Sequence, residues 1–286
     1  MPVYILYLCS ITAASIHTSL TKLFNRQSDE AAVFNVLRAF TAFLMFFLIS
    51  LPGAAFHIPT IAFGMGYGVF LSIAMYMGYL ALCLGPMALT SMMISFSVLF
   101  PVLWGIVLRH EEVTILQGAA FLLLLIALFL VNADKLRQKT KPDTDYKKWF
   151  LYAAATCLCN GGCSILQKEH QTAFPGLYSR EFMAAAMGMC TVIFLCIAVR
   201  KVTFLSFRQT SGKWYAVFAG ITNSTANFCT LIMTGMENAS VLFPMISAGT
   251  IIATLICGIL IFREKPKVNQ YAALTAGILS VILLKL

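Results

Sequence analysis

The chain has 286 residues, of which 60% are hydrophobic and 11% are charged, and its mean hydropathy is +0.85. Because soluble domains carry about 25% charged residues, this composition excludes a soluble globular protein and predicts a membrane protein. The formal net charge is +9. No basic patch lies on a soluble fold, so we place most Lys and Arg beside lipid headgroups and expect no nucleic acid as a partner.

The first half of the chain holds five apolar runs. A membrane-spanning helix needs roughly 20 apolar residues, and we expect such helices at residues 3–23, 31–51, 61–84, 87–108 and 113–131. The first run lacks the basic start of a cleaved signal peptide, so we interpret it as a spanning helix. Gly85-Pro86 predicts a turn, and Pro101 predicts a kink in the fourth helix.

Residues 134–148 are the longest polar stretch, and they mix six basic with three acidic residues. We interpret this stretch as a linker loop between two domains, residues 1–133 and residues 149–286. The second domain also holds five apolar runs, at residues 149–168, 177–199, 214–234, 239–262 and 269–286.

Two stretches, residues 85–132 and 238–286, look like copies of each other. A shift of 153 places Glu111 on Glu264 and Gln117 on Gln270, and a shift of 152 places Ser95 on Ser247. Five helices per half is an odd number, so a second half of the same fold must enter the membrane from the opposite side. The predicted fold is therefore all-α: a polytopic membrane protein with ten transmembrane helices in two inverted five-helix repeats.

The same stretches carry a family pattern. In the first copy Gly85-Pro86 precedes a spanning helix, then the charged break Arg109-His110-Glu111, then Gln117-Gly118-Ala119-Ala120; the second copy has Arg263-Glu264 and Gln270-Tyr271-Ala272-Ala273 at matching places. This pattern resembles the drug/metabolite transporter superfamily, EamA type, over essentially the whole chain. The resemblance implies a central cavity lined by six of the helices. It leaves the substrate open, because that superfamily handles amino acids, drugs, sugars and nucleotide conjugates.

Polar side chains within spanning runs are costly unless they face protein or water. We expect the substrate to bind to a set of such residues: Asn160, Asn223, Asn227, Tyr76, Tyr79, Ser95, Ser164 and Ser247. Asn offers both donors and acceptors, which suits a zwitterionic or amide-bearing solute. The alternative is that Asn, Ser and Thr bridge neighbouring helices, and that the two tyrosines pack against lipid or neighbouring helices.

His17 titrates near neutral pH, so we expect it to carry the coupling proton; the alternative is a neutral histidine, hydrogen-bonded in a packed helix. Arg38 either extends to the interface or attracts an anion. Glu111 and Glu264 are expected to fix interhelical turns. No catalytic motif is present. Cys157, Cys159 and Cys163 lack the usual spacing of a zinc site. We therefore expect no enzyme activity, no cofactor and no metal.

These observations predict a secondary transporter that moves a small polar or amphiphilic metabolite by alternating access. A flippase of a lipid or lipid-linked substrate on the same scaffold is the alternative, and a non-transporting membrane protein is a third class. The expected partners are a small-molecule substrate and the lipid bilayer, with a homodimer left open. We expect a multi-pass protein of the cell membrane, a bacterial inner membrane by family likeness. Loops on one side hold fifteen Lys and Arg against four on the other, which places both termini outside.

Overall fold

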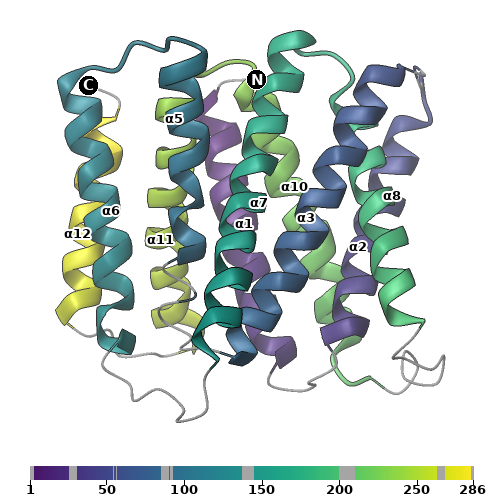
Figure 1. Ribbon diagram of the computed structural model, residues 1–286, viewed down its shortest axis with the longest axis horizontal. Coiled ribbons are helices and arrows are strands. Elements are labelled where there is room, and N and C mark those ends of the chain that lie inside the picture. The colour runs from purple at the N-terminus through teal and green to yellow at the C-terminus, as the bar shows by residue number, and fades with distance from the viewer. Residues whose placement is uncertain are drawn as a thin grey trace. The chain divides into compact units, whose positions relative to one another are not determined.

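The computed structural model describes residues 3–25, 31–53, 55, 57–84, 90, 93–136, 145–199, 210–262 and 268–284. Within these residues every regular element is a helix (Figure 1). The helices are α1 Val3–Asn25, α2 Ala31–Ser50, α3 Ile58–Leu84, η1 Phe96–Val98, α5 Leu99–Leu108, α6 Ile115–Leu136, α7 Tyr146–Ala173, α8 Ser179–Ala198, α10 Lys213–Thr234, α11 Ala239–Phe262 and α12 Val268–Leu283.

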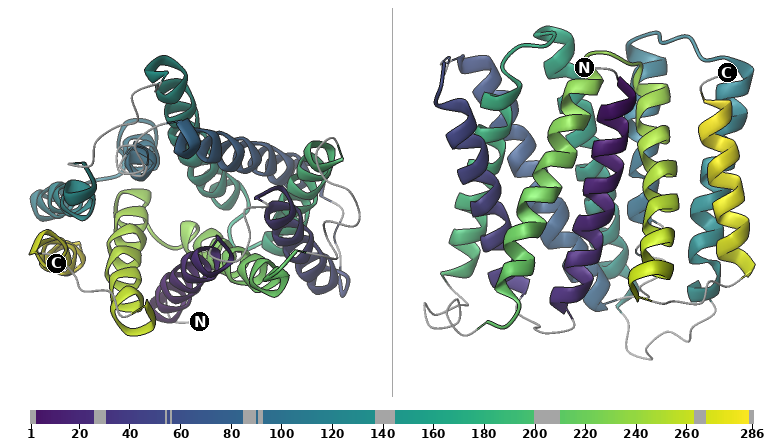
Figure 2. Two further views of the ribbon diagram at one scale, coloured as in Figure 1. Left: turned by 90° about the horizontal axis from the view of Figure 1, so that it is seen from below. Right: turned by 180° about the vertical axis from the view of Figure 1, so that it is seen from behind.

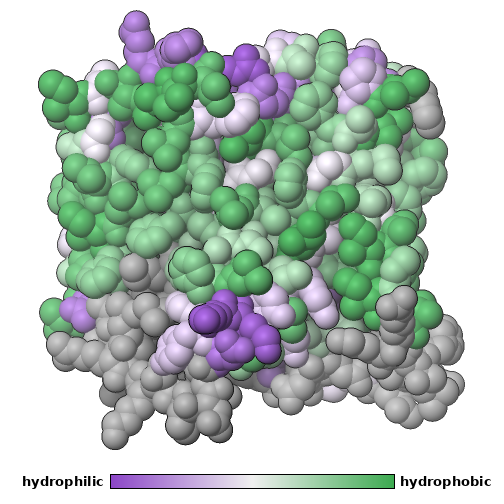
Figure 3. All heavy atoms as spheres, in the orientation of Figure 1, coloured by the Kyte–Doolittle hydropathy of each residue, from purple (hydrophilic) through white to green (hydrophobic). Residues whose placement is uncertain are grey.

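The lengths and compositions of these helices are those of membrane spans. Among the described residues, seven helices are long and apolar enough to cross a bilayer: α1, α2, α3, α7, α8, α10 and α11. Three shorter apolar helices lie at Met93–Leu108, Ile115–Leu130 and Val268–Leu283. The face seen in Figure 3 is mainly hydrophobic across its middle, and the hydrophilic side chains gather in groups near its upper and lower edges. The chain is therefore an all-helical, polytopic membrane protein.

The expected helix ranges agree with the structure to within a few residues, with three exceptions. The run expected at 113–131 continues to Leu136. The run expected at 87–108 contains the tight turn η1, which ends three residues before Pro101 of α5. Proline has no N–H to donate to the carbonyl four residues earlier, so the helix is distorted on its amino-terminal side. The run expected at 149–168 continues to Ala173, which brings His170 into α7.

The chain forms two compact units, and each is made from both halves of the sequence. Unit 1 is Met1–Ser72 with Leu166–Met236, and unit 2 is Ile73–Ile165 with Glu237–Leu286. The long helices α3 and α7 each contribute one part to either unit. The expected domains, residues 1–133 and 149–286, are consecutive along the sequence, whereas each compact unit takes segments from both of them. The division into two sequence repeats remains a prediction. Of the expected linker loop, residues 137–144 lie outside the described part.

In unit 1 two packed pairs of helices, α1 with α10 and α2 with α8, run antiparallel. Ser10 of α1 donates to the carbonyl of Ala226 in α10, 3.2 Å away, while Phe24 at the end of α1 packs on Ala216 at the start of α10. Arg180 at the start of α8 reaches the carbonyl of Ile49 at the end of α2. These contacts pair α1 with α10 and α2 with α8.

Two glycines set the separation of α3 and α8 in unit 1. A Cβ on Gly68 would collide with the carbonyl of Ala186, and one on Gly64 would lie 2.6 Å from the carbonyl of Phe182. Glycine at both positions lets the two backbones approach closely, as small residues do between membrane helices.

Unit 2 shows the same antiparallel pairing. Ser280 near the end of α12 donates to the carbonyl of Ala120 near the start of α6, 2.8 Å away, and Figures 1 and 2 show these two helices side by side.

Glu111, which follows α5, contacts the start of α11. Its carboxylate accepts two hydrogen bonds, each 2.9 Å long, from the backbone N–H groups of Ala239 and Ser240. Glu111 therefore caps α11, where two otherwise unpaired donors need an acceptor.

Candidate functional site

Unit 1 contains many buried polar side chains on its spanning helices. Such groups are costly in an apolar interior unless they are hydrogen-bonded. The buried residues of this kind include Ser10, Arg38, Thr60, Gln167, His170, Gln171, Ser224 and Thr234. Unit 1 holds three groups of hydrogen-bonded polar side chains: the Arg38 group, the Asn227 group and the His170 network.

The Arg38 group joins α1 to α2. Nη1 of Arg38 lies 3.3 Å from Nε2 of His17, and Nη2 donates to Oδ1 of Asn35, 3.1 Å away. The guanidinium also lies over the ring of Phe34, 5.5 Å from its centroid. Because arginine only donates, Nε2 of His17 must accept this hydrogen bond. His17 is therefore neutral here, with its proton on Nδ1.

Arg38 is only 7% exposed. Its side chain is thus held in the interior of unit 1 and does not extend along the surface of α2. Gly220 of α10 makes this packing close, since a Cβ there would collide with the carbonyl of Arg38 and with the hydroxyl of Thr41. The structure therefore places the guanidinium beside His17 of α1, while α10 packs closely on the backbone of α2 at the same level.

The Asn227 group joins α3, α7 and α10. The hydroxyl of Tyr67 donates to Oδ1 of Asn227, 2.9 Å away, and Nδ2 of Asn227 donates to the carbonyl of Asn223, also at 2.9 Å. Nε2 of Gln167 donates to the backbone carbonyl of Asn227, 3.2 Å away. The amide of Asn227 is therefore held in one orientation, with one acceptor lone pair and one N–H beyond these bonds. Asn223 lies one turn earlier and is half-buried.

The remaining predicted site residues belong to unit 2. Ser164 donates to the carbonyl of Asn160 in α7, 3.4 Å away, and both residues are half-buried. Tyr79 of α3 is 45% exposed. Tyr76, Ser95 and Ser247 are half-buried, and Ser95 directly precedes η1. The structure thus brings Asn223 together with Asn227, and Asn160 with Ser164, and it divides the predicted set between the two units.

The His170 network orders the connection between α7 and α8. The N–H of Gly176 donates to Oε1 of Gln171 at 3.1 Å, which identifies Nε2 of Gln171 as the donor end of the amide. That nitrogen donates to Oγ of Ser179 at 3.0 Å and to Nδ1 of His170 at 3.2 Å. Since Nδ1 accepts, the proton of the neutral His170 ring is on Nε2.

The network continues toward α3. Nε2 of His170 donates to the hydroxyl of Thr60 at 3.1 Å, and that hydroxyl shares a hydrogen bond of 2.9 Å with Nδ1 of His57. His57 stacks on Tyr178, with ring centroids 4.5 Å apart and planes 9° from parallel. His170, Gln171 and Thr60 are at most 1% exposed, so water cannot replace these hydrogen bonds.

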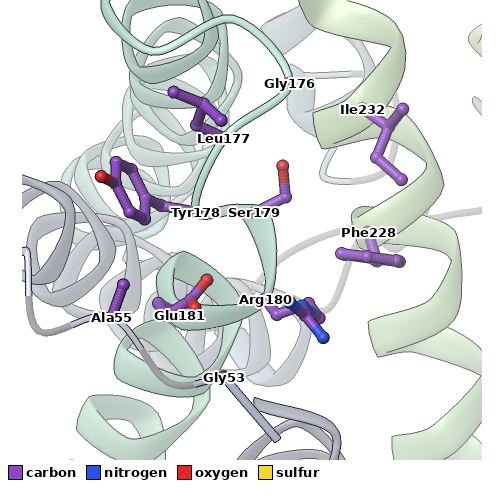
Figure 4. Close-up of a pocket in the computed structure, with 10 residues that line it drawn as sticks. All are labelled: Gly53, Ala55, Gly176, Leu177, Tyr178, Ser179, Arg180, Glu181, Phe228 and Ile232. Carbon is purple, nitrogen blue, oxygen red and sulfur yellow. The ribbon is translucent and has the colours of Figure 1, made fainter.

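A pocket of about 440 Å³ lies beside this network, within unit 1 (Figure 4). Its walls come from the connection between α2 and α3, from the turn and first residues of α8, and from α10. The lining residues are Gly53, Ala55, Gly176, Leu177, Tyr178, Ser179, Arg180, Glu181, Phe228 and Ile232. Figure 4 shows Arg180 on the side of Phe228 and Glu181 on the side of Tyr178.

Sequence reasoning missed the His170 network and this pocket. The segment Gln167–Thr172 is polar, so it resembles the end of a helix and not its continuation. The signal that could have identified it is spacing: Gln167, His170, Gln171 and Phe174 recur at helical intervals and share one face. Among the described residues, no group of three or more His, Cys, Asp or Glu side chains could hold a metal ion.

Apolar spans with hydrogen-bonded polar side chains between them define a polytopic membrane protein with a polar interior. Residues 147–286 match the EamA-like transporter family. This match confirms the resemblance to the drug/metabolite transporter superfamily, EamA type, that was drawn from the sequence.

Comparison with solved structures supports the fold along the chain. One of them, titled only "Crystal structure of protein", superposes with a TM-score of 0.77 at 17% sequence identity, covering 97% of this chain and 96% of that one. At this identity the likeness concerns the fold alone. No curated protein matches the sequence significantly.

Proposed function

We propose that this protein is a secondary transporter that moves a small polar or amphiphilic metabolite by alternating access. Its scaffold is ten transmembrane helices in two inverted five-helix repeats, residues 1–133 and 149–286. Seven long apolar helices and three shorter ones among the described residues support this proposal. In such a scaffold two related halves exchange conformations around one central site.

The observation that carries this proposal is the pairing of counterpart helices. The sequence repeat relates α5 to α11 and α6 to α12, and the proposed order of five helices per half relates α2 to α8. In each of these three cases the helix packs on its own counterpart. Each pair is antiparallel, as the contacts of Arg180 with Ile49, of Glu111 with Ala239 and of Ser280 with Ala120 require. Halves related by an axis in the membrane plane produce this arrangement, whereas halves of the same orientation would give parallel counterparts.

For substrate binding we propose Asn160, Asn223, Asn227, Tyr76, Tyr79, Ser95, Ser164 and Ser247. The support is strongest for Asn227, because the hydroxyl of Tyr67 and the carbonyl of Asn223 orient its amide and leave one acceptor and one donor for a solute. A hydrogen-bonding group fixed by its neighbours binds a ligand with a smaller loss of conformational entropy than a mobile one.

For proton coupling we propose His17, acting together with Arg38. The neutral ring accepts a hydrogen bond from the guanidinium. A proton on Nε2 of His17 would remove that acceptor and place two cations next to each other. Protonation would therefore separate α1 from α2 at this point, and a change of charge would become a movement of helices.

A flippase of a lipid or lipid-linked substrate is the second candidate, and the buried guanidinium of Arg38 favours it. Arginine binds phosphate through several parallel hydrogen bonds, so a phosphate headgroup would suit this position. The same cation would equally attract the carboxylate of a water-soluble metabolite.

Purified protein in proteoliposomes tests the function. The vesicles are loaded with a small-molecule extract of the expression host, and solutes released over time are identified by mass spectrometry; fluorescent phospholipids in matched vesicles report lipid scrambling. We expect protein-dependent release of a water-soluble solute without scrambling. Scrambling alone would establish the flippase, and neither activity would reject both.

We further propose that the protein lies in the cell membrane with both termini outside, following the bias of Lys and Arg between loops. Several of these residues, including Arg26, Arg200, Lys201 and Arg263, lie outside the described part of the chain. A fluorescent protein that matures only in the cytoplasm, fused to the C-terminus, should stay dark. Bright fluorescence would reverse the orientation.

A further inference from the structure

The pocket beside the His170 network has fixed walls. Gly176 and Ser179 both line it, and both are bonded to the amide of Gln171 behind them. Tyr178 is held by stacking on His57, and Phe228 on the opposite wall packs on Phe46, with ring centroids 5.1 Å apart. The residues behind this wall, His170 and Gln171, are almost completely buried, so this side of the pocket is preorganised.

The chemistry of the lining combines both signs of charge with an apolar wall. Arg180 and Glu181 lie in the first turn of α8 and line the pocket, and Leu177, Phe228 and Ile232 supply its apolar surface. Arg180 has five N–H donors, and Nη1 reaches the carbonyl of Ile49 at 3.5 Å. The other donors can receive a carboxylate, and the carboxylate of Glu181 can accept an ammonium group.

We propose that this pocket binds a zwitterionic solute, with its carboxylate on Arg180, its ammonium on Glu181 and an apolar side chain against Phe228 and Ile232. Its volume of about 440 Å³ falls in the lower part of the roughly 300–1,000 Å³ range of small-molecule pockets, which suits a small metabolite. The pocket is separate from Asn227 and Arg38 and would be an access site for the solute. This proposal rests on the proposed function in one respect, that the bound solute is also the solute that the protein transports.

Equilibrium binding to the full chain in lipid nanodiscs tests the proposal. The probe is radiolabelled L-leucine, with two competitors of similar shape: leucinol, which lacks the carboxylate, and 4-methylpentanoate, which lacks the ammonium group. Arg180→Gln should weaken leucine about ten- to hundredfold, as expected for one lost charge-assisted hydrogen bond, and leave leucinol unchanged. Glu181→Gln should weaken leucine similarly and leave 4-methylpentanoate unchanged.

Arg109→Gln and Glu112→Gln are the matched controls, since each removes the same charge from an exposed position in unit 2. Both should bind leucine as the unmodified chain does. Absence of leucine binding, wild-type affinity in both pocket variants, or an equal loss of all three probes would overturn the proposal. A flux assay in proteoliposomes distinguishes the failure of the pocket proposal from the failure of the proposed function. If the protein transports a solute but the pocket variants keep the leucine affinity of the unmodified chain, only the pocket proposal is wrong. If leucine binding depends on Arg180 and Glu181 but no solute is transported, only the proposed function is wrong.

Discussion

Nη1 of Arg38 lies 3.3 Å from Nε2 of His17. Arginine can only donate this hydrogen bond, and the histidine can accept it only while Nε2 carries no proton. This contact joins α1 to α2 inside unit 1. It makes the protonation of His17 and the position of Arg38 mutually dependent, and it gives the proton-coupling proposal a specific structural consequence.

The first prediction concerns pH. His17→Gln keeps an acceptor for Arg38 but cannot titrate, so the variant should transport at a rate that no longer varies over about pH 5 to 8, whereas the unmodified protein should vary several-fold in that window. The measurement is the initial rate of solute flux in proteoliposomes at a series of pH values. A pH profile identical to that of the unmodified protein would rule out a proton role for His17.

The second prediction concerns the orientation of Asn227. Tyr67→Phe removes the hydroxyl that donates to Oδ1 of Asn227 and should lower the free energy of unfolding by about 1 kcal/mol. Because both residues share one hydrogen bond, the double variant Tyr67→Phe/Asn227→Ala should be little less stable than Asn227→Ala alone. Chemical unfolding in detergent measures the cycle, and strictly additive losses would show that the contact contributes nothing.

The third prediction concerns the contact of α3 with α8. Gly68→Ala places a Cβ against the carbonyl of Ala186, a backbone atom that cannot turn away, so the variant should lose about 1–3 kcal/mol of stability. Gly118→Ala in α6 is the matched control. A Cβ there has no neighbour within 4 Å, so alanine should stabilise the helix by roughly 0.5–1 kcal/mol. Equal effects at both positions would contradict the close packing.

The fourth prediction concerns the cap of α11. Glu111→Ala leaves the N–H groups of Ala239 and Ser240 without their acceptor and should cost about 0.5–2 kcal/mol, whereas Glu111→Gln, which keeps one acceptor oxygen, should cost less. Glu112→Ala at the exposed neighbouring position should be close to neutral. Thermal unfolding of the three variants side by side provides the comparison, and a Glu112 loss as large as that of Glu111 would argue against a specific cap.

The helix boundaries could be predicted from the sequence because they depend on local composition. An apolar run ends where charged residues and turn formers begin, so α1 and α11 lie within two residues of their expected ends. The prediction failed for the end of α7, where Gln167 and His170 are polar but find partners on α3 and α10. From the sequence alone, a polar side chain that is hydrogen-bonded to a distant helix cannot be told from one that is hydrogen-bonded to water.

The candidate site could be predicted only as a set of residue types. The bond of Tyr67 with Asn227 joins positions 160 residues apart, and no local periodicity encodes such a pairing. Glu111 was expected to fix the turn after α5, and its backbone N–H does bond the carbonyl of Gly105 at 3.0 Å. Its carboxylate also reaches the first N–H groups of α11, which the sequence did not indicate. Its counterpart Glu264 lies outside the described residues.

Alternating access is tested most directly by the accessibility of one site residue from the two sides of the membrane. Asn223→Cys, in a chain whose exposed Cys83 and Cys196 are replaced by serine, is reconstituted in vesicles and treated with a membrane-impermeant maleimide on either side. The account predicts labelling from an aqueous side, with the balance between the sides shifting when a transported solute is added. Labelling by a membrane-permeant maleimide alone, with no reaction from either aqueous side, would place Asn223 against packed protein or lipid and contradict the account.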